Sequence, residues 1–194
     1  MATETAARLR ELPVLTGTAP DSSLTGWSPD PAPQFLRWLD AAVAAELPEP
    51  HVAVLSTVDA DGVPDARALI VKDVDERGWA FAGPASSAKG TQLVVNPAAA
   101  LTIWWQPLVR SIRVRGRVVE ATPEESAADL AARSAAARAD VAAGDWRLWR
   151  VIPDRVEFWQ GSADRRHIRV VYSRGADAGW SVSASAGGDS IRLG

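Results

Sequence analysis

Val156-Glu157-Phe158-Trp159-Gln160-Gly161, followed by Arg165-Arg166-His167-Ile168-Arg169, is the most informative stretch of this sequence. Its pattern predicts an aromatic-rich strand, a polar turn, and a second strand that carries arginines and a histidine. A planar aromatic side chain beside guanidinium groups suits a flat anionic ligand, because arginine presents a rigid fork of donors to carbonyl, carboxylate or phosphate oxygens. An ordinary hairpin with solvated charges is the alternative interpretation.

The size of the chain, 194 residues, fits one domain over residues 34–194. Residues 1–33, here called the N-terminal arm, are rich in Pro, Thr, Ser and Asp and are expected to be extended or partly ordered. The hydrophobic fraction of 47% is enough for a sizeable core, and the net charge of −3 argues against nucleic acid as the main partner.

Several classes of site and location are disfavoured by composition. The sequence contains no cysteine, and its only histidines are His51 and His167, so neither a thiolate nor a multi-histidine metal site is expected. No apolar run approaches the roughly 20 residues that span a membrane. The first residues lack the basic start and apolar segment of a secretion signal, so a soluble cytoplasmic protein is expected.

Lysine is rare in this chain, and its two positions are informative. Of the 21 residues that are lysine or arginine, only Lys72 and Lys89 are lysine. A composition that favours arginine leaves lysine where a compact point charge is needed, although chance survival is the alternative.

The hydrophobic pattern changes from helical spacing to strand spacing along the chain. Short strands joined by turns that bear Asp and Gly indicate an antiparallel meander, and a closed or nearly closed barrel would remove its edges. Helices are predicted over 33–47, 86–95 and 122–140, and strands over 51–57, 66–72, 79–82, 99–105, 110–120, 151–159 and 168–173, with a final pair near Trp180 and Ile191.

Two local patterns are specific. Residues 110–120 alternate, so that Arg113, Arg115 and Arg117 share one face of a strand, which is interpreted as a solvated or subunit-facing surface. Thr122 and Glu125 match a capping box at the start of the predicted helix 122–140.

The order of the motifs resembles the pyridoxamine 5′-phosphate oxidase family, the flavin-dependent split β-barrels. The resemblance runs from about residue 34 to the C-terminus and implies a mainly β fold with helices, an antiparallel split β-barrel that binds FMN. It implies a homodimer with FMN between the subunits. The matching segments are Arg67–Lys72, Asp75–Phe81, Ser86–Gln92, Asn96-Pro97, Trp104–Arg110 and Pro153–Arg169.

The resemblance also assigns roles to single residues. Arg67 and Lys89 match the contacts to the FMN phosphate, and Trp159 and Arg169 match the residues that border the isoalloxazine ring. The other matched cofactor positions are Ile70, Val71, Lys72 and Ser111.

The substrate pocket is implied at four matched positions, Lys72, Arg133, Arg165 and His167. In the family the substrate gives a hydride to the flavin, and dioxygen reoxidises the flavin with release of hydrogen peroxide. Arg165 and His167 are therefore the catalytic candidates. His167 is either a polar contact or proton donor, or a structural residue of the hairpin.

The sequence departs from the family pattern mainly on the substrate side. Ala88 replaces an arginine, Ser111 a glutamine, Asp129 a tyrosine and Ala137 a serine. Asp129 places a negative charge where the family receives a phosphate dianion, or it pairs with Arg133 four residues later. Residues 142–145 lead directly to Trp146, where the family has a Gln-Ser pair and a long excursion.

The leading hypothesis is an FMN-dependent oxidoreductase retuned to another small planar substrate, as in the phenazine-biosynthesis flavin oxidases, a related branch that handles non-phosphorylated aromatics. A true pyridoxal 5′-phosphate synthase is the second hypothesis. A non-catalytic flavin-, deazaflavin- or haem-binding module is the third.

Overall fold

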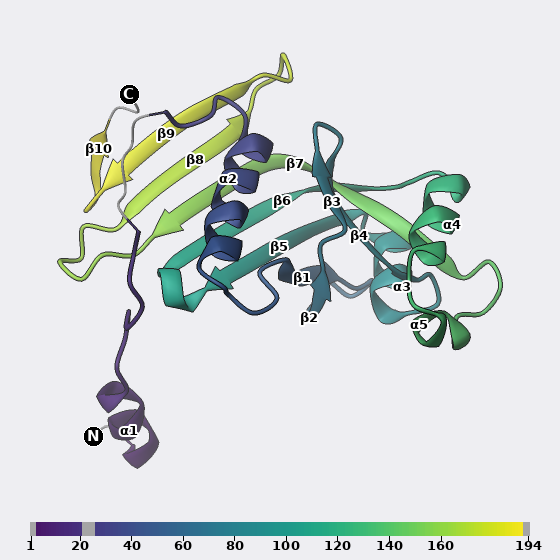
Figure 1. The fold of residues 1–194 in the computed structure, drawn as a ribbon, viewed down its shortest axis with the longest axis horizontal. Coiled ribbons are helices and arrows are strands. Elements are labelled where there is room, and N and C mark those ends of the chain that lie inside the picture. Colours follow the sequence, from purple (N-terminus) through teal and green to yellow (C-terminus); the bar gives the residue numbers. More distant parts are fainter. Residues whose placement is uncertain (1–2, 21–25, 192–194) are drawn as a thin grey trace.

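The computed structural model describes residues 3–20 and 26–191. They form an antiparallel sheet with helices along it (Figure 1). The helices are α1 (Glu4–Glu11), α2 (Pro31–Ala44), α3 (Ala88–Val95), α4 (Pro123–Ala131) and α5 (Ala135–Ala139), with a 3₁₀ turn over Gln106–Leu108. The strands are β1 (Val52–Val58), β2 (Pro64–Ile70), β3 (Asp73–Asp75), β4 (Gly78–Pro84), β5 (Ala98–Trp105), β6 (Arg110–Glu120), β7 (Trp146–Gln160), β8 (Ile168–Arg174), β9 (Trp180–Ala186) and β10 (Asp189–Ile191).

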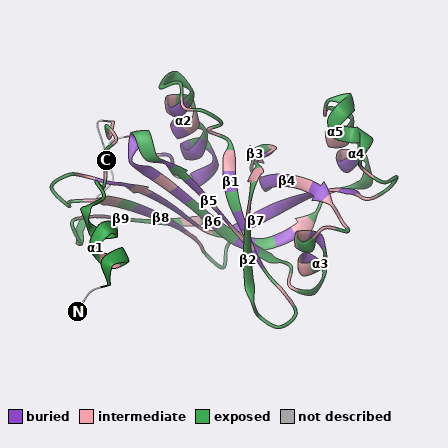
Figure 2. Ribbon diagram, turned by 90° about the horizontal axis from the view of Figure 1, so that it is seen from below, coloured by how far each residue is buried: buried purple, intermediate pink, exposed green. Residues whose placement is uncertain are grey.

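The sheet divides at the long strand β7. One edge of β7 pairs with β6; the other pairs with β4 over residues 146–151 and with β8 over residues 155–160. The order β2-β1-β5-β6-β7-β4-β3 forms the barrel, and beyond the second half of β7 the strands β8, β9 and β10 continue the sheet (Figure 1). Buried residues follow one another along β4 and β7, the strands that join the two parts (Figure 2). The fold is therefore a split β-barrel, as the sequence predicted.

Two consecutive residues after β2 close the barrel. The N–H of Val71 donates to the His51 carbonyl at 2.9 Å, beside β1. The N–H of Lys72 donates to the Ala80 carbonyl in β4 at 2.8 Å. Because adjacent residues bond to opposite neighbours, this short link joins β1 to β4 and fixes the backbone of Lys72.

Aromatic side chains dominate the core between α2 and the sheet. Phe35 and Trp38 of α2 are buried and contact Trp79, Trp105 and Phe158 at centroid distances of 5.1–6.4 Å. Large rings in edge-to-face and stacked contact supply much of the apolar area buried in such a core.

The alternation predicted for residues 110–120 is confirmed in β6. Ile112, Val114 and Val118 are buried, whereas the three arginines between them, Arg113, Arg115 and Arg117, are exposed. The predicted capping box is also confirmed, because the Thr122 hydroxyl accepts from the Glu125 N–H and the Glu125 carboxylate accepts from the Thr122 N–H.

The N-terminal arm contains more regular structure than its composition predicts. Its described residues include α1, which lies apart from the sheet (Figure 1). Trp27 packs on Trp38 and Phe158 at 5.8 and 5.6 Å, so the core begins before residue 34. The part of the arm over residues 21–25 lies outside the described residues.

The prediction of one continuous helix over 122–140 is wrong. It is divided into α4 and α5, and the side chain of Ser134 accepts from the Ala137 N–H at 3.2 Å as the N-cap of α5. A serine hydroxyl competes with the helical backbone for donors and favours a new helix start. Arg133 consequently lies in the link after α4 rather than on a helix.

Candidate functional site

Arg67 in β2 is held by polar groups from its own strand and from two other segments, β1 and α3. Its guanidinium donates to the buried hydroxyl of Thr57, to the carboxylate of Asp65, and to the Gln92 Oε1 atom at 3.1 Å. The hydrogen bond that Gln92 donates, more than the charge of Arg67, lowers the pKa of Asp65. The guanidinium therefore has a fixed orientation beside the start of α3.

Lys89 lies in the first turn of α3, next to Arg67. Its ammonium donates to the Ser87 Oγ atom at 3.0 Å, and among the described residues it forms no ion pair with a carboxylate. Burial, and then the charge of Arg67, lower the pKa of Lys89. Its side chain passes over Gly83, where a Cβ atom would lie 2.3 Å from the Lys89 Nζ atom.

The arrangement fits an anion such as the phosphate of FMN. Two cations converge at the N-terminus of α3, and only Arg67 has a carboxylate beside it within the described residues. Ser87, the N-cap of α3, makes no side-chain capping hydrogen bond there, so the first N–H groups of α3 add to the attraction for a phosphate. Gly83 leaves the space that Lys89 occupies.

A second cluster joins Lys72, Asp129, Trp146 and Arg133. The Lys72 Nζ atom lies 3.8 Å from the Asp129 Oδ1 atom, and the Trp146 Nε1–H donates to the Asp129 Oδ2 atom at 2.8 Å. The Arg133 guanidinium lies over the Trp146 ring, 4.6 Å from its centroid. The expected pairing of Arg133 with Asp129 is wrong, because Arg133 lies beyond the end of α4.

An aromatic surface forms where β7 meets β8. The Trp159 ring lies 5.1 Å from the ring of His167 and 6.1 Å from that of Trp104. In the strand register, Trp159 stands opposite Ser111 on one side and Arg169 on the other. The strand pairing thus places Ser111, Trp159 and Arg169, three of the residues that the resemblance assigned to the cofactor, side by side.

Polar contacts orient the side chains around this surface. The Nδ1 atom of His167 accepts from the Ser162 N–H at 3.0 Å, which places the ring proton of the neutral imidazole on Nε2. The Arg169 Nε atom lies 3.8 Å from the buried carboxylate of Glu157. Arg165 is exposed in the turn at a φ of 65°.

The predicted cofactor residues form two groups within one chain. Arg67 and Lys89 lie by β2 and α3, with Val71 buried and Ile70 exposed near them, and Trp159 lies in β7. Strands β1, β5 and β6 separate β2 from β7 in the sheet. At about 4.8 Å per strand spacing, this is roughly 19 Å along the curved sheet.

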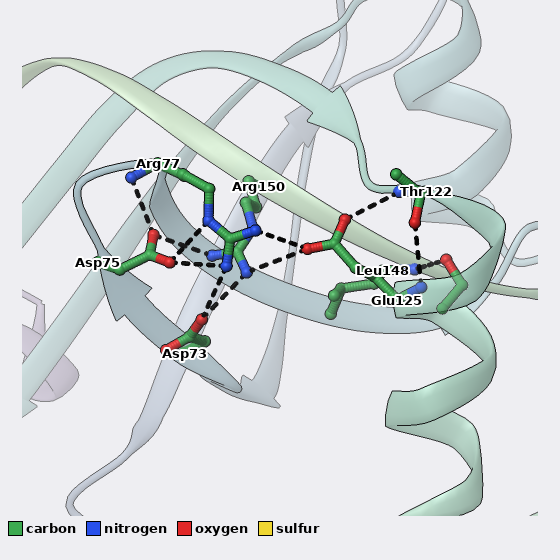
Figure 3. Close-up of polar contacts among 8 residues, drawn as sticks. Asp73, Asp75, Arg77, Thr122, Glu125, Leu148 and Arg150 are labelled. Carbon is green, nitrogen blue, oxygen red and sulfur yellow. Dashed lines mark hydrogen bonds and ion pairs between the residues drawn. The ribbon is translucent and has the colours of Figure 1, made fainter.

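A network of charges fixes α4 against the barrel (Figure 3). The buried guanidinium of Arg150 in β7 contacts Asp73 at 3.0 Å, Asp75 at 3.2 Å and Glu125 at 3.8 Å. Arg77 bridges the same carboxylates from the exposed side. Since Asp73 follows Lys72 and Glu125 precedes Asp129 by one helical turn, the network holds the Lys72–Asp129 pair in place.

Sequence reasoning missed several neighbours of the predicted residues. Thr57 and Ser87 supply hydroxyls to the cations, Gly83 supplies space, and Trp146 binds Asp129. Gln92 belongs to the matching segment Ser86–Gln92, but its contact with Arg67 did not follow from that match. Hydroxyls and a glycine at ordinary strand and cap positions carry no signal until the segments are brought together.

The fold and the site define a split-barrel protein with two adjacent cations at a helix N-terminus. The chain belongs to the pyridoxamine 5′-phosphate oxidase family. The family model "Pyridoxamine 5'-phosphate oxidase" matches residues 39–160, and "Pyridoxine 5'-phosphate oxidase C-terminal dimerisation region" matches residues 146–185. Members of this family are oxidoreductases that bind FMN.

One curated relative is similar to the chain in sequence, and two solved structures are similar to it in fold. The "Pyridoxine/pyridoxamine 5'-phosphate oxidase" of Burkholderia multivorans is 39% identical over 189 residues, which cover 80% of this chain and 88% of the relative. PhzG from Burkholderia lata 383, solved in complex with tetrahydrophenazine-1-carboxylic acid, superposes with a TM-score of 0.76 at 22% identity, covering 83% of this chain and 94% of that one. A pyridoxamine 5′-phosphate oxidase-related, FMN-binding protein from Nostoc punctiforme superposes with a TM-score of 0.68 at 19% identity, covering 86% and 100%.

A helix that spans a membrane must be both long and apolar. Within residues 3–20 and 26–191, no helix meets both requirements.

Proposed function

We propose that this chain is an FMN-dependent oxidoreductase that oxidises a small planar substrate. The Arg67–Lys89 cluster carries the proposal, because two adjacent cations at a helix N-terminus, with Gly83 clearing the space, suit a phosphate monoester. FMN, when bound, supplies a ring that accepts a hydride from the substrate and returns the electrons to dioxygen.

The residues of the chain bind and orient. Arg67 and Lys89 hold the phosphate, while Trp159 and Arg169 offer an aromatic face and a cation for the ring and Ile70, Val71 and Ser111 line its approach. His167, whose Nδ1 atom is engaged with Ser162, presents Nε2 to a substrate as a hydrogen-bond donor.

A homodimer would bring together the two sets of predicted cofactor residues, the cations Arg67 and Lys89 and the residues Trp159 and Arg169. The Arg67–Lys89 pair and the aromatic surface at Trp159 lie on strands about 19 Å apart along the curved sheet. Among the described residues, no hydrogen bond, ion pair or aromatic contact joins the two within one chain. A second copy that supplies Trp159 and Arg169 beside the first copy's Arg67 and Lys89 would complete a site. The match of residues 146–185 to a dimerisation region supports this arrangement.

Titration of the purified protein with FMN tests the cofactor. The flavin absorbance peak should shift and saturate, and Arg67→Ala should weaken the binding. A shared site predicts that mixing Arg67→Ala with Trp159→Ala subunits restores one intact site per mixed dimer. Protein that leaves the FMN spectrum unchanged, or that prefers a deazaflavin by ligand-induced melting shift, would contradict the proposal.

The second candidate is a pyridoxine or pyridoxamine 5′-phosphate oxidase, favoured by the name of the 39% identical relative. Peroxide release is the assay that separates the two. Saturable turnover of pyridoxine and pyridoxamine 5′-phosphates at physiological concentrations would establish the second candidate. FMN that no substrate reduces faster than free FMN would indicate a binding module.

A further inference from the structure

The cluster of Lys72, Asp129, Trp146 and Arg133 points to the charge of the substrate. Lys72 is one of the cations expected to receive the substrate, and its Nζ atom lies 3.8 Å from a carboxylate of the same chain. The side chains of Lys72 and Asp129 are 22% and 14% exposed, so water screens the pair only in part. The positive charge of Lys72 is therefore largely compensated before any ligand arrives.

Asp129 is held in this position from two directions. One oxygen accepts the Trp146 Nε1–H at 2.8 Å, and Trp146 is itself 7% exposed at the start of β7. The first turn of α4 is tied to Arg150 and Arg77 through Glu125. The carboxylate cannot swing aside without breaking the hydrogen bond to Trp146, so an incoming anion meets its charge.

Arg133 retains free donor capacity in the same cluster. Its guanidinium lies over the Trp146 ring rather than against a carboxylate, and its Nε atom is buried without a hydrogen-bond partner among the described residues. An unsatisfied buried donor beside an aromatic face favours an acceptor that reaches it.

The charges decide which acceptor fits. Lys72 and Arg133 contribute two positive charges and Asp129 one negative charge, so the cluster carries a net charge of about +1. A phosphate monoester carries nearly two negative charges near pH 7 and has three acceptor oxygens, one of which would approach Asp129. A carboxylate carries one negative charge and two coplanar oxygens, which match the donor fork of a guanidinium.

Resting on the proposed function, we infer that the substrate of this chain is a small planar monocarboxylate, and that Asp129 excludes phosphorylated substrates. Asp129 is thus a specificity-determining residue. Its hydrogen bond to Trp146 and its pairing with Lys72 set the charge of this cluster, and Arg133 receives the carboxylate.

Binding of two probes to the FMN-loaded protein tests the inference. The probes are phenazine-1-carboxylate, an aromatic monocarboxylate, and pyridoxine 5′-phosphate, a phosphate monoester, each titrated by quenching of flavin or tryptophan fluorescence. We expect wild-type protein to bind the carboxylate at least about tenfold more tightly than the phosphate, since like charges brought together in a partly buried site oppose binding. Equal or tighter binding of the phosphate to the wild type would overturn the inference.

Asp129→Asn removes the charge but keeps an oxygen that can accept the Trp146 Nε1–H. This variant should gain about tenfold or more in affinity for pyridoxine 5′-phosphate and gain little for the carboxylate. Asp140→Asn is the matched control. Asp140 is an exposed carboxylate at the end of α5, and its substitution changes the net charge of the protein by the same amount as Asp129→Asn. A gain of equal size in the control would attribute the effect to net charge and refute the role of Asp129.

The FMN titration separates failure of this inference from failure of the proposed function. Protein that does not bind FMN contradicts the proposed function, whereas protein that binds FMN and prefers the phosphate contradicts only the assignment of the substrate. Wild-type protein that binds FMN and neither probe also refutes the assignment.

Discussion

Substitution of Gly83 by alanine tests how the chain holds the phosphate of its cofactor. A Cβ atom at this position would lie 2.3 Å from the Nζ atom and 2.6 Å from the Cε atom of Lys89. Only the end of one flexible side chain is displaced, so β4 itself need not move. The ammonium, however, must leave its place beside Ser87 and Arg67.

The expected loss follows from one charge-assisted hydrogen bond. Such a bond to a charged group contributes about 1.5–3 kcal/mol, so the dissociation constant for FMN should rise roughly 10- to 150-fold. The melting temperature of the FMN-free protein should not fall, because alanine costs less conformational entropy than glycine in a strand.

The assay is a fluorescence titration with FMN and, as a matched ligand, riboflavin, which lacks the phosphate. Gly83→Ala should weaken FMN binding and leave riboflavin binding unchanged. In a Lys89→Ala background the Gly83→Ala change should add nothing, because both substitutions remove the same contact. Equal weakening of FMN and riboflavin, or additive effects in the double variant, would refute the reasoning.

Three further predictions concern stability. Burial and Arg67 lower the pKa of Lys89 from its ordinary 10.5, so the unfolded chain holds that proton more tightly and the charged ammonium destabilises the folded state. Lys89→Met should therefore raise the melting temperature of the FMN-free protein at pH 7. In melting curves recorded at increasing pH, this gain should disappear as the pH rises through 10.5. Arg150→Met should lower the free energy of unfolding by about 3 kcal/mol in urea titrations, since it leaves carboxylates without their buried partner, whereas the control Arg77→Met at the half-exposed position should lower it less. Thr122→Ala should cost about 1 kcal/mol in the same titrations through loss of the α4 cap, and an unchanged midpoint would contradict the capping role.

The strands were predictable because one side of each is buried and the other is not. In β6 the buried Ile112, Val114 and Val118 enforce a period of two that is visible in the sequence. The short strand β3 was not among the predicted strands, since three residues carry too little periodicity to identify a strand. The end of α4 was not predictable either, because the alanine-rich sequence around it favours a helix on both sides.

The candidate site was predictable residue by residue but not in its contacts. Spacing of four residues predicted an Arg133–Asp129 pair, yet the rule applies only inside a helix, and α4 ends before Arg133. The approach of Gly83 to Lys89 joins a strand to a helix through space, and no local pattern encodes it. Family resemblance identified the cations, and the structure added the groups that orient them.

The divided strand β7 has a consequence for how the protein folds. Most neighbours in the sheet are joined by short turns, such as β1 with β2 and β8 with β9, and those hairpins close quickly. The pairing of β4 with β7 joins Trp79 to Val151, which lie far apart in the chain. Closing so long a loop is entropically unfavourable and slows folding, so we expect barrel closure on β7 to limit the folding rate. On the ribosome, the barrel cannot close until β7 has been synthesised, because β7 is the strand that pairs with both β6 and β4.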